Sequence, residues 1–288
     1  MTAAAIAAAP RGWRAGIGLL LLPVVVFYLV MFVWPSLNVL WLSITHDQHL
    51  TLSSYIAFFS DPFSRTVLLR TVRLALLITV AALVVAYPIA LYLADPERRG
   101  RGVVTFVVLA PLLVSAVVRA YGWIIILGPN GLLSDLLLDL HLTSKPTYLL
   151  FSESAIVIAV THVYLPFMVL AIAGSLQQID PALGRAARNL GASSWRAFFR
   201  VTLPLSLPGI TAGSLIVFCL SASAFVTPTL LGGSRVPMMA YLVYNQGILL
   251  LDWHMASAIA LILLAVTAGV TLLYSWLTGR GSPVEAAR

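Results

Sequence analysis

The sequence predicts an all-α integral membrane protein with six transmembrane helices and both termini in the cytoplasm. Of its 288 residues, 60% are hydrophobic and only 9% are charged, whereas a soluble domain carries about 25% charged residues. A helix needs about 20 mostly apolar residues to cross a bilayer. Six stretches of the chain meet this requirement, near residues 16–44, 74–94, 103–127, 154–176, 204–231 and 255–278.

The distribution of basic residues predicts the orientation, because cytoplasmic loops of membrane proteins are enriched in Lys and Arg. With both termini inside, the outer loops hold only Arg65, Lys145 and Arg235. The inner side then holds Arg11, Arg14, Arg98, Arg99, Arg101, Arg185, Arg188, Arg196, Arg200, Arg280 and Arg288. An odd number of spans would remove this contrast. The net charge of +7 therefore reflects orientation, and we do not expect nucleic-acid binding.

The first apolar block predicts a retained span and not a cleaved signal peptide. Two arginines precede it and no charge follows until Asp47, so the run is far longer than the roughly 7–15 residues of a signal core. The second block follows Arg70 and Arg73, which oppose the charge rule at its outer end. We expect these arginines to snorkel outward, or the helix to begin as an outer-surface segment near Pro62.

The third and fourth blocks each contain an ionisable residue. Arg119 lies in the third, where a charge costs about 3 kcal/mol on insertion scales. It either lines a solute path or fixes an outer gate, or it snorkels to the outer interface. His162 in the fourth block either faces such a path or hydrogen-bonds a neighbouring helix. Glu153, just before that block, is expected at the interface.

Two outer segments are expected to form short helices. Residues 128–147 contain Asn130-Gly131 and Lys145-Pro146, which are typical of turns, and we expect a turn followed by a short surface helix. Residues 236–251 are apolar but short for a span and are interrupted by Asn245, Gln246 and Gly247. We interpret them as an outer-face or re-entrant helix, because a seventh span would place the C-terminus outside.

The stretch between the fourth and fifth blocks, residues 180–204, predicts two short helices at the membrane surface. Asp180 is a helix-capping residue, and Pro181 suits the first helical position. Gly191 is placed where a helix ends in a left-handed turn. Ser193 or Ser194 is placed to cap a second helix. One face of this helix carries Trp195, Phe198, Phe199 and Thr202, and another carries Arg196 and Arg200.

No catalytic chemistry is indicated. The chain has one cysteine, which excludes an internal disulfide, and its five histidines are scattered. No nucleophile–base–acid set and no GxxxxGK[ST] phosphate loop is present. We therefore expect no catalytic residues, no metal site and no cofactor in this chain.

Residues 185–204 resemble the coupling loop of permease subunits of bacterial binding-protein-dependent ABC importers. The family pattern is Glu-Ala-Ala, three residues, Gly, nine residues, an aliphatic residue, one residue and Leu-Pro. Arg185-Ala186-Ala187, Gly191 and Val201-Thr202-Leu203-Pro204 reproduce every spacing. The departure is Arg185 at the Glu position. Residues 117–133, 225–233 and the run from Asp252 also resemble the B-type subunit of spermidine/putrescine-type permeases.

The resemblance implies a type I ABC importer permease fold, a multi-pass protein of the bacterial inner membrane. It divides the chain into an N-terminal segment with the first span and an outer loop (1–65), a transmembrane domain (66–278) and a cytoplasmic tail (279–288). The implied partners are two ATPase subunits, a second homologous permease subunit, a soluble substrate-binding protein and membrane lipid. The coupling loop would dock on the ATPase through Leu183, Arg185, Ala186, Ala187, Leu190, Gly191, Arg196, Leu203 and Pro204.

The function expected from this resemblance is ATP-driven import of a small solute, most simply a polyamine. Opines, phosphonates, ferric ion and thiamine are alternative cargoes of related systems, and a stand-alone secondary transporter or channel is the alternative class. That class favours paired acids or a proton relay in the spans, which this sequence lacks. The candidate path residues are Arg119, Tyr121, His162, Tyr164 and Phe225, whose aromatic members offer cation–π faces.

Overall fold

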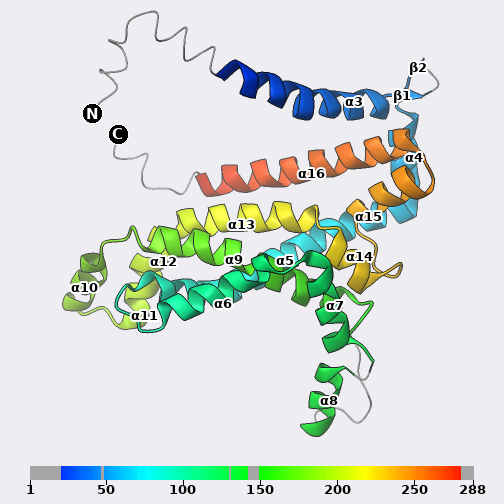
Figure 1. Ribbon diagram of the computed structural model, residues 1–288. Coiled ribbons are helices and arrows are strands. Elements are labelled where there is room, and N and C mark those ends of the chain that lie inside the picture. The colour runs from blue at the N-terminus through cyan, green and yellow to red at the C-terminus, as the bar shows by residue number, and fades with distance from the viewer. Residues whose placement is uncertain (1–20, 47–48, 130, 142–148, 280–288) are drawn as a thin grey trace, which may run out of the picture.

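The structure is a bundle of long helices with one small β-ladder (Figure 1). The computed structural model describes residues 21–46, 49–129, 131–141 and 149–279, so the predicted tail beyond Gly279 lies outside the described residues. A helix covering 21–28 leads into a π-helical turn, η1 (Leu29–Val33), and α3 (Trp34–Ser43). The ladder pairs β1 (Thr45–His46) with β2 (His49–Leu50).

The remaining elements follow in this order: α4 (Ser53–Ser60), α5 (Pro62–Ala94), α6 (Arg101–Leu113), α7 (Ala116–Leu127), α8 (Leu132–Asp139), α9 (Glu153–Leu176), α10 (Pro181–Asn189), α11 (Ser194–Ala197), π-helical η2 (Phe198–Thr202), α12 (Leu203–Leu205), α13 (Leu207–Ala222), α14 (Val226–Gly232), α15 (Met239–Tyr244), π-helical η3 (Asn245–Leu249) and α16 (Trp253–Gly279).

The core of the bundle is formed by α5, α9 and α13, which all pack against one another. Small residues recur on α5 at every fourth position, namely Ala82, Ala86 and Ala90, and all three are fully buried. Spacing by four places them on one face of the helix, and small side chains let helix backbones approach closely in a membrane. Ile156 and Ile172 of α9 lie in the same buried cluster.

Five helices among the described residues are long and apolar enough to cross a membrane, or six when the bent pair 194–205 and 207–222 counts as one span. The first, Leu21–Ser43, packs against α16 through α3 and is otherwise exposed. Its apolar side chains are therefore available to lipid. The expected all-helical membrane architecture is confirmed.

The second block begins where one of its two expected alternatives places it. Its helix starts at Pro62, ahead of the apolar stretch near 74–94, so α5 has 33 residues and includes Arg70 and Arg73. Asp61 caps it by accepting hydrogen bonds from the backbone N–H groups of Phe63 and Ser64. Hydrogen bonds from the side chain and backbone of Ser64 hold the pKa of the Asp61 carboxyl below its usual value. A capped start of this kind fixes where the helix begins.

The third and fifth blocks are also not single straight helices. The third is interrupted at Val114 and Ser115, which separate α6 from α7. The fifth begins with a 61° bend at the residue between α12 and α13, and α14 follows as a separate short helix. Single-helix predictions for 103–127 and 204–231 were therefore wrong, because apolar composition alone does not report a change of helix direction.

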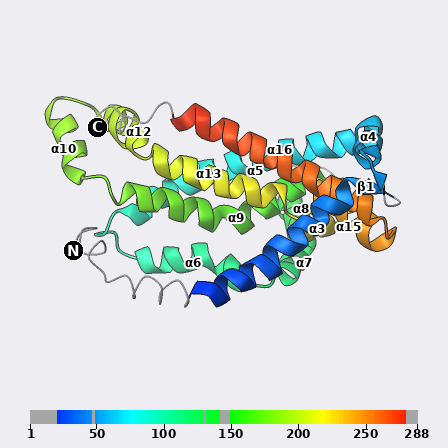
Figure 2. The ribbon, with the colours of Figure 1, turned by 90° about the horizontal axis from the view of Figure 1, so that it is seen from above.

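The two ends of the bundle carry different elements. The start of the helix at residue 21, the end of α16 and the short helix α10 lie at one end (Figures 1 and 2). The ladder, α4 and α15 lie at the opposite end. Segment 236–251 is helical from Met239 to Leu249 and lies at this second end. Helix α8 provides the expected short helix in 128–147, of which residues 130 and 142–147 lie outside the described part.

Candidate functional site

The short helices between α9 and α13 form an elbow, which we define as residues 180–205. Asp180 caps α10 by accepting a hydrogen bond from the Ala182 N–H at 2.8 Å. Gly191 follows the helix with a φ of +86°, the left-handed conformation that glycine adopts without strain. The Ala192 N–H then donates to the Ala187 carbonyl at 3.0 Å. The helix and turn predicted from the sequence are present.

Aromatic rings organise the second half of the elbow. The Ser193 hydroxyl caps α11 by accepting from the Arg196 N–H at 3.4 Å. Trp195 stacks on Phe199 with ring centroids 5.9 Å apart, and Phe198 meets Phe199 edge to face at 4.9 Å. Such ring pairs stabilise by about 0.5–1.5 kcal/mol beyond their buried area. The aromatic cluster therefore makes α11 and η2 one packed unit.

Tyr87 of α5 connects this unit to the core. Its ring meets Phe198 edge to face at 5.6 Å, and its hydroxyl lies 2.9 Å from the hydroxyl of Ser206. Ser206 is fully buried and occupies the bend before α13. The elbow is therefore joined to α13 through the chain and to α5 through Tyr87. This link could not be predicted from the sequence, because Tyr87 and Ser206 are far apart along the chain.

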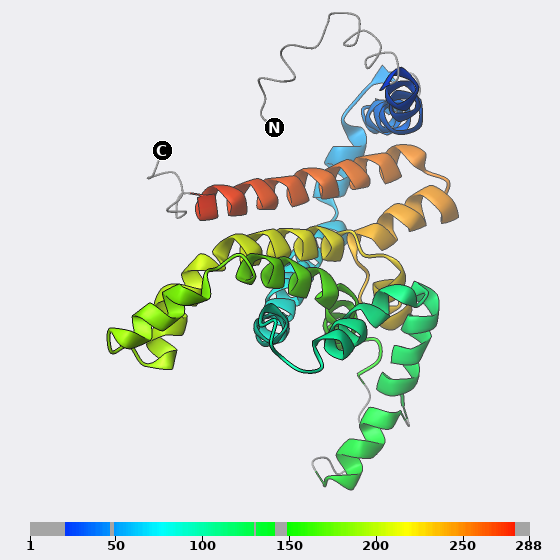
Figure 3. The same cartoon turned by 60° about the vertical axis from the view of Figure 1, so that its left-hand side comes forward.

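The predicted docking residues are largely available on the elbow surface. Leu183 is 47% exposed and Leu190 89% exposed. The others that are exposed are Arg185, Ala186, Gly191, Arg196 and Pro204, whereas Ala187 and Leu203 are half-buried. Leu203 packs against the main core. Figure 3 shows α10 and α11 projecting beyond the end of the helical bundle.

A groove lies where the elbow joins the bundle. Its volume is about 730 Å³, and its walls come from the ends of α9 and α13 and the start of α10, including Gly174, Gln178, Asp180, Leu183 and Gly209. The groove is open to the surface and mainly apolar. Two of its lining residues belong to a close contact, because α13 approaches α9 at Gly209, where an added Cβ would lie 2.5 Å from the Ser175 Cβ.

Arg119 makes its described hydrogen bonds within the third apolar block. Its Nη1 donates hydrogen bonds to the carbonyl oxygens of Pro111 and Val114, so the side chain crosses the break between α6 and α7. These carbonyls belong to the end of α6, where backbone acceptors lack helical partners. The guanidinium thus satisfies acceptors that the interruption leaves free.

Three of the five path candidates lie together. Arg119 is within electrostatic range of His162 and Tyr164, and the His162 ring meets Trp123 edge to face at 5.5 Å. The described contacts do not join the other two candidates to this group. Tyr121 is 56% exposed, and Phe225 packs against Tyr244 with ring centroids 5.2 Å apart.

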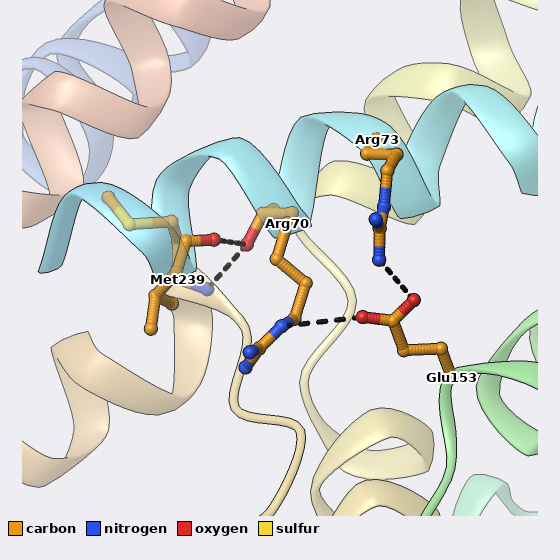
Figure 4. Close-up of polar contacts among 6 residues, drawn as sticks. Arg70, Arg73, Glu153 and Met239 are labelled. Carbon is orange, nitrogen blue, oxygen red and sulfur yellow. Dashed lines mark hydrogen bonds and ion pairs between the residues drawn. The ribbon is translucent and has the colours of Figure 1, made fainter. Parts of the chain in front are cut away.

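An ion-pair network at the opposite end of the bundle was missed. Glu153, at the start of α9, pairs with both Arg70 and Arg73 of α5 (Figure 4). Beside them, the Met239 N–H donates to the Thr71 hydroxyl at 3.0 Å, which joins α15 to α5. The sequence analysis predicts no pairing between the two arginines and the acid. Their opposite charges at the ends of neighbouring spans could have predicted this ion pairing.

No metal-binding cluster is found: the described residues contain no group of three or more His, Cys, Asp or Glu side chains placed to hold an ion. The polar features of the described chain are instead the elbow, the Arg119 group and the Glu153 network. None of these has the arrangement of a nucleophile with its base.

Comparison with known proteins identifies the family. Residues 18–280 match the model described as "Binding-protein-dependent transport system inner membrane component". The chain belongs to this family. It is therefore a multi-pass inner-membrane permease component of a binding-protein-dependent ABC importer, and not a catalytic subunit.

The relatives that match the chain are named for different cargoes. The chain is 33% identical over 264 residues to the spermidine/putrescine transport system permease protein PotB of Escherichia coli, covering 89% of this chain and 95% of PotB. It is 35% identical over 161 residues to the molybdenum transport system permease protein ModB of Haemophilus influenzae, covering 54% of this chain and 69% of ModB. The fold is also similar to that of a solved structure, a bacterial alginate ABC transporter in complex with alginate pentasaccharide-bound periplasmic protein. One of its chains superposes with a TM-score of 0.80 at 19% identity, covering 94% of this chain and 95% of that chain.

Proposed function

We propose that this permease carries a polyamine-like small cation into the cytoplasm. The observation that supports this cargo is the similarity to PotB over nearly the whole of both chains. Exposed and half-buried aromatic rings on the candidate path residues Tyr121, Tyr164 and Phe225 offer cation–π faces to an ammonium group. The helices α5, α6, α7, α13 and α16 contain no acid, whereas the candidate span 116–139 holds Asp135 and Asp139.

The partners proposed are two ATPase subunits, a second homologous permease and a soluble binding protein. The alginate transporter, whose chain shares this fold, is in complex with a ligand-bound periplasmic protein. The binding protein would select the solute, which accounts for the acid-poor spans. The ATPases would supply the energy, since no nucleotide-binding loop is present in this sequence.

The elbow is proposed as the surface that receives force from the ATPase. It projects from the bundle, exposes apolar residues such as Leu190, and is joined to the core through Tyr87 and Ser206. Closure of the ATPases would move it, and the movement would reorient α5 and α13 around the solute path. This is a rigid-body change between two access states.

The cargo is tested by reconstituting the full transporter with its binding protein and measuring uptake of labelled putrescine and spermidine. We expect competition between the two polyamines and none from an opine, a phosphonate, ferric ion, thiamine or molybdate. Uptake of one of those solutes in place of polyamine would contradict the proposed cargo and leave the assignment as an ABC importer unchanged. Uptake by this chain alone, without ATPase subunits, would support the stand-alone transporter instead.

The coupling role is tested with Ala187→Glu, which places a long acid on the half-buried face of α10. We expect binding-protein-stimulated ATP hydrolysis to fall to the unstimulated rate, while the permease remains folded in detergent. Arg99→Glu, at an exposed loop position outside the elbow, is the matched control and should keep stimulation. Unchanged stimulation in Ala187→Glu would contradict docking through α10.

A further inference from the structure

The elbow carries a set of positive charges without internal compensation. Arg185, Arg188, Arg196 and Arg200 are all exposed, and none of them makes an ion pair within the part of the chain that the structure describes. The only acid of the elbow is Asp180, whose carboxylate accepts from the Ala182 N–H as the cap of α10. The elbow therefore presents a basic surface to whatever covers it.

Arg185 lies on an exposed side of α10, away from the two half-buried residues of the helix. Gly184 and Ala187 are half-buried, and α10 contacts α11 and η2. The helical period places Arg185 on the other side, where Ala182, Ala186 and Asn189 are exposed neighbours. Because these neighbours are short, a protein surface that covers this face comes close to the backbone and encloses the guanidinium.

An enclosed guanidinium needs a carboxylate opposite it. Removing an ion from water costs several kcal/mol unless a partner and hydrogen bonds compensate, and Arg offers a planar fork that matches a carboxylate. We propose that the ATPase subunit presents an acidic side chain to Arg185, with Arg188 completing a basic patch. This inference rests on the proposed docking role of the elbow and specifies the chemistry of its partner.

A lipid surface fits this face less well. An interfacial helix buries a continuous apolar face, but α10 carries only one large apolar side chain, Leu183, within its helical turns. The exposed rings of Trp195 and Phe199 are better placed for lipid, and they lie on α11 and η2. The outward face of α10, with its alanines and arginine, suits a protein cleft of complementary charge.

The test measures binding of the purified ATPase subunit to the full-length permease in nanodiscs made without anionic lipid. Arg185→Glu is expected to weaken binding by at least about tenfold, Arg185→Gln by less, and Arg185→Lys to retain most of it. The wild-type affinity should fall with added salt, and this dependence should be reduced in Arg185→Gln. Arg99→Glu is the charge-matched control, and a second measurement of thermal unfolding verifies that each variant is folded.

Rescue identifies the partner residue. Acidic residues of the ATPase are changed singly to Lys, and one of these changes should restore binding to Arg185→Glu while weakening binding to the wild type. Affinity that is unchanged in Arg185→Glu but lost in Ala187→Glu would overturn the acidic partner and leave the docking role intact. Affinity unchanged in both would remove the docking role. Loss of binding in Arg185→Glu only when anionic lipid is added would assign the arginine to lipid and overturn the proposal.

Discussion

At the scale of single residues, Arg119 shows how a costly charge is accommodated in an apolar segment. Its Nη1 donates to the carbonyls of Pro111 and Val114, so the charge supports the interruption between α6 and α7. Hydrogen bonds from a charged donor contribute about 1.5–3 kcal/mol. We predict that Arg119→Met lowers the thermal unfolding temperature in detergent by several degrees, and that Arg119→Lys lowers it less. Lost transport with unchanged stability would instead assign Arg119 to the solute path.

A second prediction at this scale concerns Glu153, which lies between Arg70 and Arg73. The pairs are partly exposed, with side-chain exposures of 22% for Arg70 and 37% for Glu153, so each contributes at most about 1 kcal/mol. Glu153→Gln also leaves two like charges adjacent on α5. We predict a lower unfolding temperature at low salt that approaches the wild-type value at high salt. Glu97→Gln, an exposed acid outside the network, should show no such dependence on salt.

At the scale of elements, α9 and α13 are held together by a contact that only glycine permits. An added Cβ at Gly209 would lie 2.7 Å from the Ala171 carbonyl oxygen, whereas one at Gly174 would meet nothing within 4 Å. Overpacking of this kind costs about 1–3 kcal/mol. We predict that Gly209→Ala destabilises the permease and that Gly174→Ala is neutral or stabilising, because alanine favours helix. Equal unfolding temperatures for the two variants would contradict the close approach.

The same scale shows what the sequence could and could not predict. Apolar length identified most of the spans, and the cap at Asp180 and the turn at Gly191 were read from residue type, because capping and left-handed turns depend on local chemistry. The break after α6 could not be read in this way. Pro111 lies just before it, yet Pro88 and Pro166 lie within continuous helices. Whether a proline interrupts a helix depends on which neighbouring groups form hydrogen bonds with the freed backbone groups. Here the guanidinium of Arg119 donates those hydrogen bonds.

At the scale of the whole molecule, the elbow and both described chain ends lie at one end of the bundle, and the start of α9, where Glu153 lies, is toward the other (Figure 1). The excess of arginine on the elbow predicts that its end is cytoplasmic. In a Cys219→Ala background, we predict that Arg188→Cys reacts with a membrane-impermeant maleimide only in inside-out vesicles. Arg65→Cys, near the start of α5, should react in intact cells with a permeable outer membrane. The reverse pattern would place the elbow outside, where no ATPase could reach it.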